Sequence, residues 1–112
     1  MKKLTAVCAS ALLLLSLNVF ADPHLDQAIE HATAAVEHGK AGHASVLVQH
    51  ARPALEHAMA ASVTAKGLSR TKVEAAMADL EEAIKHGKLD HADVATTYVE
   101  AALEDLQAAN KK

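Results

Sequence analysis

The sequence is poor in cysteine and in aromatic residues. Its 112 residues include one cysteine, one tyrosine, one phenylalanine and no tryptophan. The cysteine, Cys8, lies in an apolar run near the N-terminus, so the rest of the chain has no thiol for a disulfide, a thiolate metal site or cysteine catalysis. So few aromatic side chains predict a thin, alanine-rich core whose stability is modest or depends on a bound ligand.

Long apolar runs are also scarce, and the one present predicts an export signal. Two lysines precede an apolar stretch over residues 4–17, and small residues stand at the −3 and −1 positions of a cleavage point after Ala21. The stretch is shorter than the roughly 18 apolar residues of a membrane-spanning helix. We therefore expect residues 1–21 to be a cleaved secretory signal peptide. The mature product, residues 22–112, is expected to be one exported, soluble domain that is not bound to a membrane.

Positive charge is in deficit as well. The chain has 11 Lys and Arg against 14 Asp and Glu, a formal net charge of −3. The predicted signal carries two of the lysines and none of the acids, so the mature domain is still more acidic. A net negative charge opposes binding to phosphate backbones, and we expect no nucleic-acid partner.

What the sequence does contain is an internal repeat with a period of 48 residues. Residues 31–61 align with residues 79–109, and 12 of the 31 aligned positions are identical. Both copies include the motif H-G-K-x-x-H, which occupies residues 38–43 and 86–91. A repeat of this length is typical of helix-pair units.

Four segments have apolar residues at spacings of three and four, as on one face of an amphipathic helix. With short connections, this pattern predicts an all-α fold. The expected architecture is an up-down-up-down four-helix bundle made of two duplicated antiparallel helical hairpins. We place hairpin one at residues 22–63, a linker at 64–70 and hairpin two at 71–110.

Local signals suggest where these helices begin and end. Gly39 is a C-terminal stop for the first helix, and Thr71 with Glu74 forms a capping box for the third. Asp90 is the expected start of the fourth helix. Pro53 lies inside the second helix, where we expect a kink and not the loss of the helix.

Histidine is the residue in excess. Within the first two helices it recurs every seven residues, beside the apolar stripe. Positions that face each other across an antiparallel turn have residue numbers with a constant sum, and three histidine pairs share one sum. These predicted rungs, about 10.5 Å apart along the hairpin, are His38/His43, His31/His50 and His24/His57. In the second repeat the same positions hold His86/His91, Asp79/Tyr98 and Lys72/Asp105.

Paired imidazoles across two helices predict sites for divalent transition metals. Two imidazoles completed by water or a carboxylate suit tetragonal Cu(II) better than a closed zinc site, which takes four protein ligands. We expect Cu(II) foremost, with Ni(II) or Zn(II) as alternatives. A square-planar amino-terminal copper site is excluded, because Pro23 has no amide hydrogen to lose. The candidate metal ligands are His24, His31, His38, His43, His50, His57, His86 and His91.

Two other classes of function are alternatives to metal binding. Clustered histidines also suit a pH-responsive helical interaction or stress protein, in which they act as a proton switch. A haem or di-iron bundle enzyme has little support, since the chain lacks a C-x-x-C-H motif and an E-x-x-H pair. We therefore expect no enzymatic activity.

The segments AVEHGKAGH, VLVQHARPALEHA and AIKHGKLDHADVAT resemble the small metal-binding protein family of ammonia-oxidising and related bacteria. The resemblance covers essentially the whole mature chain. It implies a periplasmic, monomeric four-helix bundle that binds several divalent ions, copper foremost, in copper storage, buffering or tolerance. The family's heptad histidines match the eight histidines of this chain. Four positions of the second repeat depart from histidine, which implies a lower metal capacity here: Asp79, Tyr98, Lys72 and Asp105.

Overall fold

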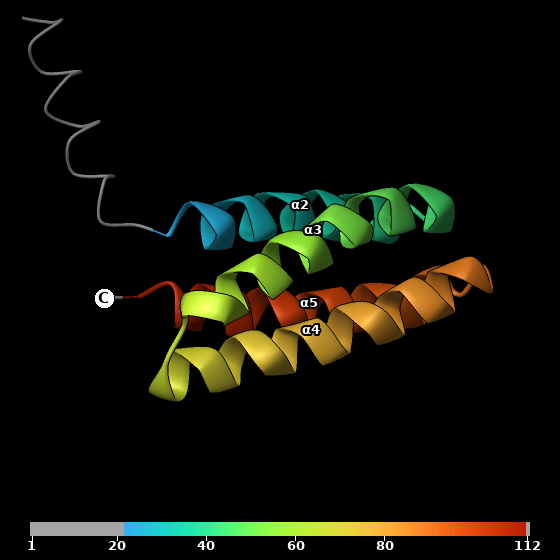
Figure 1. Cartoon of the computed structure of the whole chain (residues 1–112). Coiled ribbons are helices and arrows are strands. Elements are labelled where there is room, and N and C mark those ends of the chain that lie inside the picture. Colours follow the sequence, from blue (N-terminus) through green and yellow to red (C-terminus); the bar gives the residue numbers. More distant parts are fainter. Residues whose placement is uncertain (1–21, 112) are drawn as a thin grey trace, which may run out of the picture.

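The computed structural model describes residues 22–111, which form four α-helices in sequence (Figure 1). Their bounds are α2 Pro23–Lys40, α3 Ala44–Thr64, α4 Gly67–Lys88 and α5 Ala92–Ala109. The predicted all-α four-helix bundle is confirmed for these residues. The predicted signal peptide, residues 1–21, lies outside the described part of the chain.

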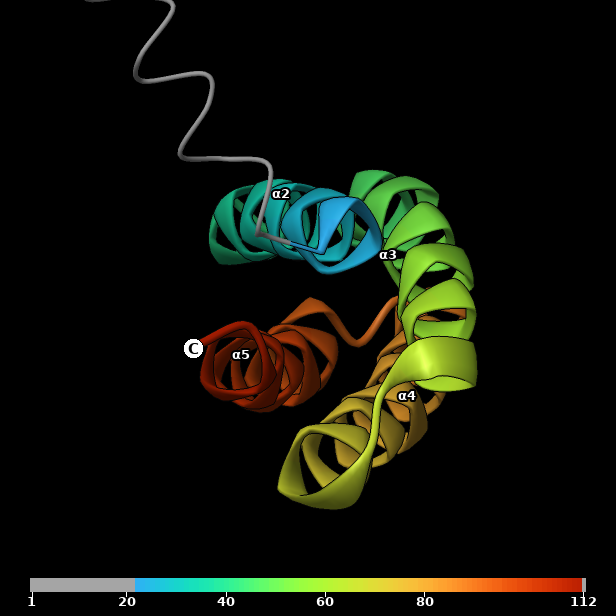
Figure 2. The same cartoon turned by 60° about the vertical axis from the view of Figure 1, so that its left-hand side comes forward.

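The helices pack as two antiparallel hairpins laid side by side. α2 packs on α3 and α4 on α5 within the hairpins, while α3 contacts α4 and α2 contacts α5 between them (Figures 1 and 2). The core between them is built mainly from alanines, with five larger side chains fully buried among them. These are Leu47, Leu80, Leu106, Val73 and Val99. None of the helices within residues 22–111 is both long enough and apolar enough to cross a membrane.

The turns that close the two hairpins differ from those predicted. α2 continues through Gly39 to Lys40, and the left-handed residue of the turn is Gly42, with φ 82°. The equivalent position of the second turn is Asp90, with φ 62°, so Asp90 does not start the fourth helix. Aspartate is one of the few residues other than glycine that adopt this conformation readily. The prediction of Gly39 as the end of the first helix was wrong because the turn residue is Gly42. The prediction of Asp90 as the start of the fourth helix was wrong because Asp90 is the turn residue of the second hairpin.

The connection between the hairpins is shorter than the predicted linker over residues 64–70. α4 begins at Gly67, so Thr71 lies within the helix, where its hydroxyl donates to the Gly67 carbonyl at 3.3 Å. Glu74 does not complete a capping box. It pairs instead with Arg70 at 2.9 Å, four residues earlier, and a pair at this spacing supports the helix.

Pro53 does not interrupt α3, which runs as one helix from Ala44 to Thr64. The prediction that the second helix survives its proline is confirmed. In Figure 2 the helix follows a curved course around the bundle, as expected where a proline removes a backbone hydrogen bond.

The glycines of the repeated H-G-K motif allow the two hairpins to approach closely. A Cβ atom at Gly39 would overlap the hydroxyl of Thr96 in α5, and one at Gly87 would overlap the side chain of Val48 in α3. Val48 and Thr96 are 48 positions apart, so the two contacts correspond between the repeats. The lack of a side chain at these two glycines is therefore needed for packing between the hairpins, which explains part of the repeated motif without any metal.

Candidate metal centre

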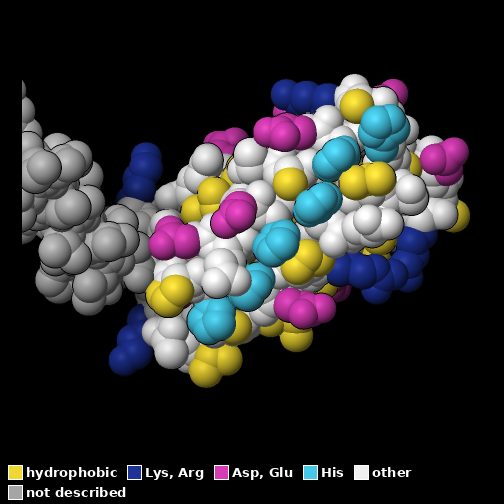
Figure 3. Space-filling view, turned by 90° about the horizontal axis from the view of Figure 1, so that it is seen from above, with side chains coloured by type: hydrophobic (Ala, Val, Ile, Leu, Met, Phe, Trp, Pro, Cys, Tyr) yellow, Lys and Arg dark blue, Asp and Glu magenta, His cyan; other side chains and the backbone are white. Residues whose placement is uncertain are grey.

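Six histidines form one continuous row along the edge where α2 packs against α3. Figure 3 shows their side chains crossing one face of the molecule as a single line. Three come from α2, two come from α3, and His43 directly precedes α3. Ring centroids of successive histidines are 5.4 to 6.1 Å apart. In order from the turn, the row is His43, His38, His50, His31, His57 and His24.

The heptad spacing places these side chains on one edge of each helix. Seven residues are nearly two helical turns, so every seventh side chain returns to the same stripe. Each histidine of the row is followed in sequence by a buried residue, and in five of the six cases this is alanine or glycine. These small residues let the helix backbones approach while the imidazoles stay at the surface edge. The four interior histidines are half-buried, and the two terminal ones, His24 and His43, are exposed.

All three predicted facing pairs lie close together. Centroid separations are 5.7 Å for His24/His57, 6.1 Å for His31/His50 and 6.1 Å for His38/His43. This is the arrangement that the constant-sum rule predicted from the sequence.

The structure also contains diagonal pairs that the sequence interpretation missed. His31 stacks on His57 with centroids 5.8 Å apart and ring planes 6° apart. His38 stacks on His50 at 5.4 Å and 2°. The rungs are still seven residues apart along each helix, as expected, but the rings of one rung also contact those of the next, so diagonal neighbours are as close as facing ones.

The spacing of the row suits one metal ion between any two successive imidazoles. With metal–nitrogen bonds of about 2.0 Å, two ring centroids bound to one ion are at most about 6.3 Å apart. Every successive pair falls below this limit. The Nδ1 atoms of His24 and His57 are 3.4 Å apart. That value lies inside the range of about 2.8 to 4.2 Å that two nitrogens on one ion can span.

The same geometry limits each ion to two imidazoles of the row. Neighbouring histidines on the same helix are seven residues, or about 10.5 Å, apart, which exceeds the single-ion limit for the ring orientations observed. Within residues 22–111 no group of three or more His, Asp or Glu side chains could hold one ion. Acidic side chains flank the row in Figure 3, but they are not gathered around any pair. Water would therefore supply the remaining ligands.

The second hairpin follows the same path with different chemistry. His86 and His91 have ring centroids 6.0 Å apart, like the equivalent pair in hairpin one. Tyr98 stacks on His86 at 5.6 Å and 9°, as His50 stacks on His38. Beyond Tyr98 the equivalent positions are Asp79, Asp105 and Lys72, and Lys72 pairs with Asp105 at 3.5 Å. Hairpin two thus offers a single imidazole pair.

His86 has an unusual surrounding for a surface histidine. Its Nδ1 is buried and has no hydrogen-bond partner among residues 22–111, while its Nε2 lies 3.8 Å from a carboxylate oxygen of Glu82. A buried ring nitrogen without a partner is costly unless a ligand binds it. This observation fits the His86/His91 pair to a metal ion.

Asp79 occupies the position of the second repeat that corresponds to His31 of the first. Burial, and after it repulsion from the carboxylate of Asp105, raises the pKa of Asp79 above its ordinary value of 3.8. A raised pKa in the folded state means that the neutral form is favoured by folding. The stability associated with this group is present at low pH and is lost as the pH rises through the folded-state pKa. Above that folded-state pKa, the charged form of Asp79 therefore opposes folding.

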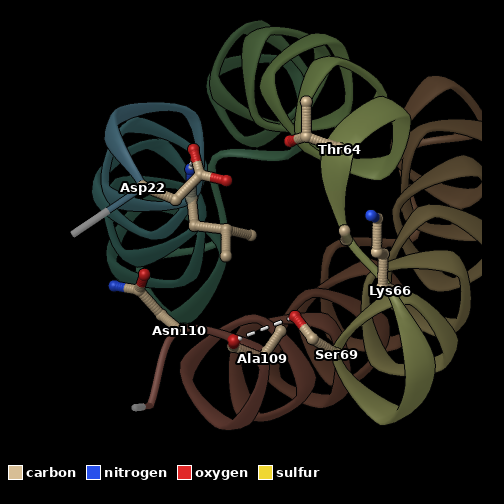
Figure 4. Close-up of a pocket in the computed structure, with 8 residues that line it drawn as sticks. Asp22, Thr64, Lys66, Ser69, Ala109 and Asn110 are labelled. Carbon is tan, nitrogen blue, oxygen red and sulfur yellow. Dashed lines mark hydrogen bonds between the residues drawn. The ribbon is translucent and has the colours of Figure 1, made fainter. Parts of the chain in front are cut away.

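A separate hollow of about 340 Å³ lies where the four helix ends away from the hairpin turns meet (Figure 4). Its lining includes Asp22, Lys66 and Asn110 but no histidine. The Ser69 hydroxyl donates to the Ala109 carbonyl at 3.1 Å across one side of it. This hollow offers none of the nitrogen ligands found in the row.

The structure is thus a four-helix bundle with a row of six imidazoles along its first hairpin. A family model described as small metal-binding protein matches residues 1–109. The chain therefore belongs to the small metal-binding protein family, and it is a metal-binding protein. No curated protein matches the chain.

Proposed function

We propose that the protein sequesters or buffers divalent transition metals in the periplasm, with Cu(II) foremost and Ni(II) or Zn(II) as weaker ligands of the same sites. The observation that carries this proposal is the row itself, in which each imidazole lies within single-ion distance of the next. The role is one of binding by mass action, without catalysis. The apolar N-terminal stretch with its small-residue cleavage point supports export.

The preference for copper follows from what each pair can supply. Two nitrogen ligands leave several coordination positions to water, which Cu(II) accepts in a tetragonal arrangement. Structural zinc sites take four protein ligands, and no pair here gathers them. For the same nitrogen ligands, affinity also rises from Ni(II) to Cu(II) and falls again at Zn(II).

The chain is proposed to act as a monomer whose partners are the metal ions. The acidic balance of the mature domain disfavours nucleic acid, and no membrane anchor is expected after signal cleavage. Binding that orders the row would also add stability to a core made mostly of alanine.

Calorimetric titration with Cu(II), Ni(II) and Zn(II), on protein beginning at Asp22, tests this function. Six imidazoles make at most three separate pairs, and His86/His91 adds a fourth, so we expect four Cu(II) per chain. The double variant His31→Ala/His50→Ala removes the central facing pair and should bind three.

Gln27→Ala/Gln49→Ala is the matched control, because both glutamines are exposed, lie on α2 and α3, and are not part of the row. It should still bind four ions. Unchanged stoichiometry in the histidine variant would contradict metal binding by the row. A sharp loss of metal-free stability near pH 6 without copper uptake at pH 7.5 would favour the proton-switch function instead.

A further inference from the structure

We propose that the six imidazoles of hairpin one are one shared track and not three independent sites, so that a bound ion can move along the row without leaving the protein. This inference rests on the proposed function, since it concerns how the same histidines hold metal. It arises from the diagonal pairs His38/His50 and His31/His57.

The ring centroids of the diagonal pairs are about as close together as those of the facing pairs. Their centroid separations are 5.4 and 5.8 Å, against 5.7 to 6.1 Å for the facing pairs. Successive facing pairs are about 10.5 Å apart along the helices, the rise of seven residues, and the diagonal pairs bridge this interval. The row therefore provides five overlapping pairs, all below the single-ion limit of about 6.3 Å.

Overlap means that every interior imidazole belongs to two pairs. An ion held by His31 and His50 can bind His57 while it keeps His31 and releases His50. The new bond uses the free lone pair of the neutral His57 ring, and the lone pair that held the ion stays with the released His50 ring, so no proton has to move. The ion keeps two imidazoles before and after the step, and its oxidation state does not change.

The ends of the track differ from its middle in a way that suits entry and release. The interior rings are half-buried, whereas His24 and His43 are exposed. His24 and His38, which contacts His43 at the other end, are 14 residues or roughly 21 Å apart along α2. An ion taken up at the turn can thus be delivered at the opposite end of the bundle.

Hairpin two shows the same path with the track interrupted. After His91 and His86 the next position holds Tyr98, and the one after that holds Asp79. An ion bound there has no further imidazole to move to. The protein therefore contains, in one chain, a track of six imidazoles and an isolated pair for comparison.

Two double variants separate a shared track from independent rungs. His24→Ala/His43→Ala and His38→Ala/His57→Ala each destroy the same two facing pairs, so independent rungs predict equal Cu(II) stoichiometry, one ion on hairpin one in both. A shared track predicts two ions for the first variant, held by the diagonal pairs, and one for the second. With His86/His91 counted, the expected totals are three and two.

Equal totals of two with a normal wild-type titration would overturn the track while leaving the metal-binding function intact. Absence of copper binding by the wild type would overturn both. His24 and His43 are exposed, and His43 makes no side-chain cap bond to α3, so their replacement should leave the helices folded. If an alanine variant loses its helical circular dichroism, the corresponding glutamine variant replaces it in the comparison.

Movement along the row has its own readout. With one equivalent of Zn(II), the imidazole NMR signals of all six row histidines should shift together. The exchange between their metal-bound and metal-free states should be faster than the removal of Zn(II) from the protein by an excess of chelator. Signals that exchange no faster than this release rate would show that ions leave the protein between sites, which contradicts a track.

Discussion

Hairpin one loses its metal binding entirely when the four half-buried histidines of the row are replaced together by alanine. The two that remain, His24 and His43, lie at opposite ends of the row and have no partner within single-ion distance. Only His86/His91 is left, so Cu(II) stoichiometry should fall from four to one. The replaced residues are His31, His38, His50 and His57.

This loss should not reflect unfolding. Alanine has a higher helix propensity than histidine, by a few tenths of a kcal/mol per position, roughly, in host peptides. The rings lie at the edge of the helices, and the fully buried core residues do not include them. The quadruple variant should therefore keep its helical circular dichroism. His86→Ala/His91→Ala is the matched comparison and should lose one ion only. Retention of three or more ions by the quadruple variant would show that groups outside the row bind the metal.

Copper binding should weaken by roughly 100-fold when the pH falls from 7.5 to 5.5, because each pair must release up to two protons to bind an ion and free histidine titrates in this range. Titrations at several pH values, with the protons released measured in buffers of different ionisation enthalpy, check this prediction. Sites built from carboxylates would keep their affinity to a lower pH, since free carboxylic acids titrate near pH 4. Affinity that stays constant between pH 7.5 and 5.5 would contradict imidazole ligation.

The helices and the facing histidine pairs could be predicted from the sequence because both depend on periodicity. Apolar spacings of three and four define the core face, and antiparallel pairing defines which residues oppose each other. His31 and His50 were thus placed together from their numbers alone, and the structure confirms their proximity.

The diagonal pairs could not be predicted in the same way. They depend on the axial stagger of α2 against α3, which follows from the turn between Lys40 and Ala44 and from how the side chains interdigitate. The numbers of His31/His57 and of His38/His50 do share a second constant sum. This pattern was available in the sequence. However, the stagger of the two helices decides whether the facing pairs, the diagonal pairs or both have rings in contact.

The turn and linker corrections have a similar origin. Gly39 resembles a helix stop, but its lack of a side chain is used for the close contact with Thr96, and the turn conformation falls on Gly42. Local signals could not distinguish these uses, because the contact joins residues from different hairpins. The same limitation applies to the start of α4, where the Arg70/Glu74 pair replaces the expected cap.

The number of imidazoles bound to each copper ion tests the central claim most directly. Pulsed electron paramagnetic resonance of the wild-type protein with one equivalent of Cu(II) can count the coordinated imidazole nitrogens. The geometry of the row predicts two imidazoles per ion, with water in the remaining positions. A count of three or four, or of none, would contradict binding by successive pairs along the row.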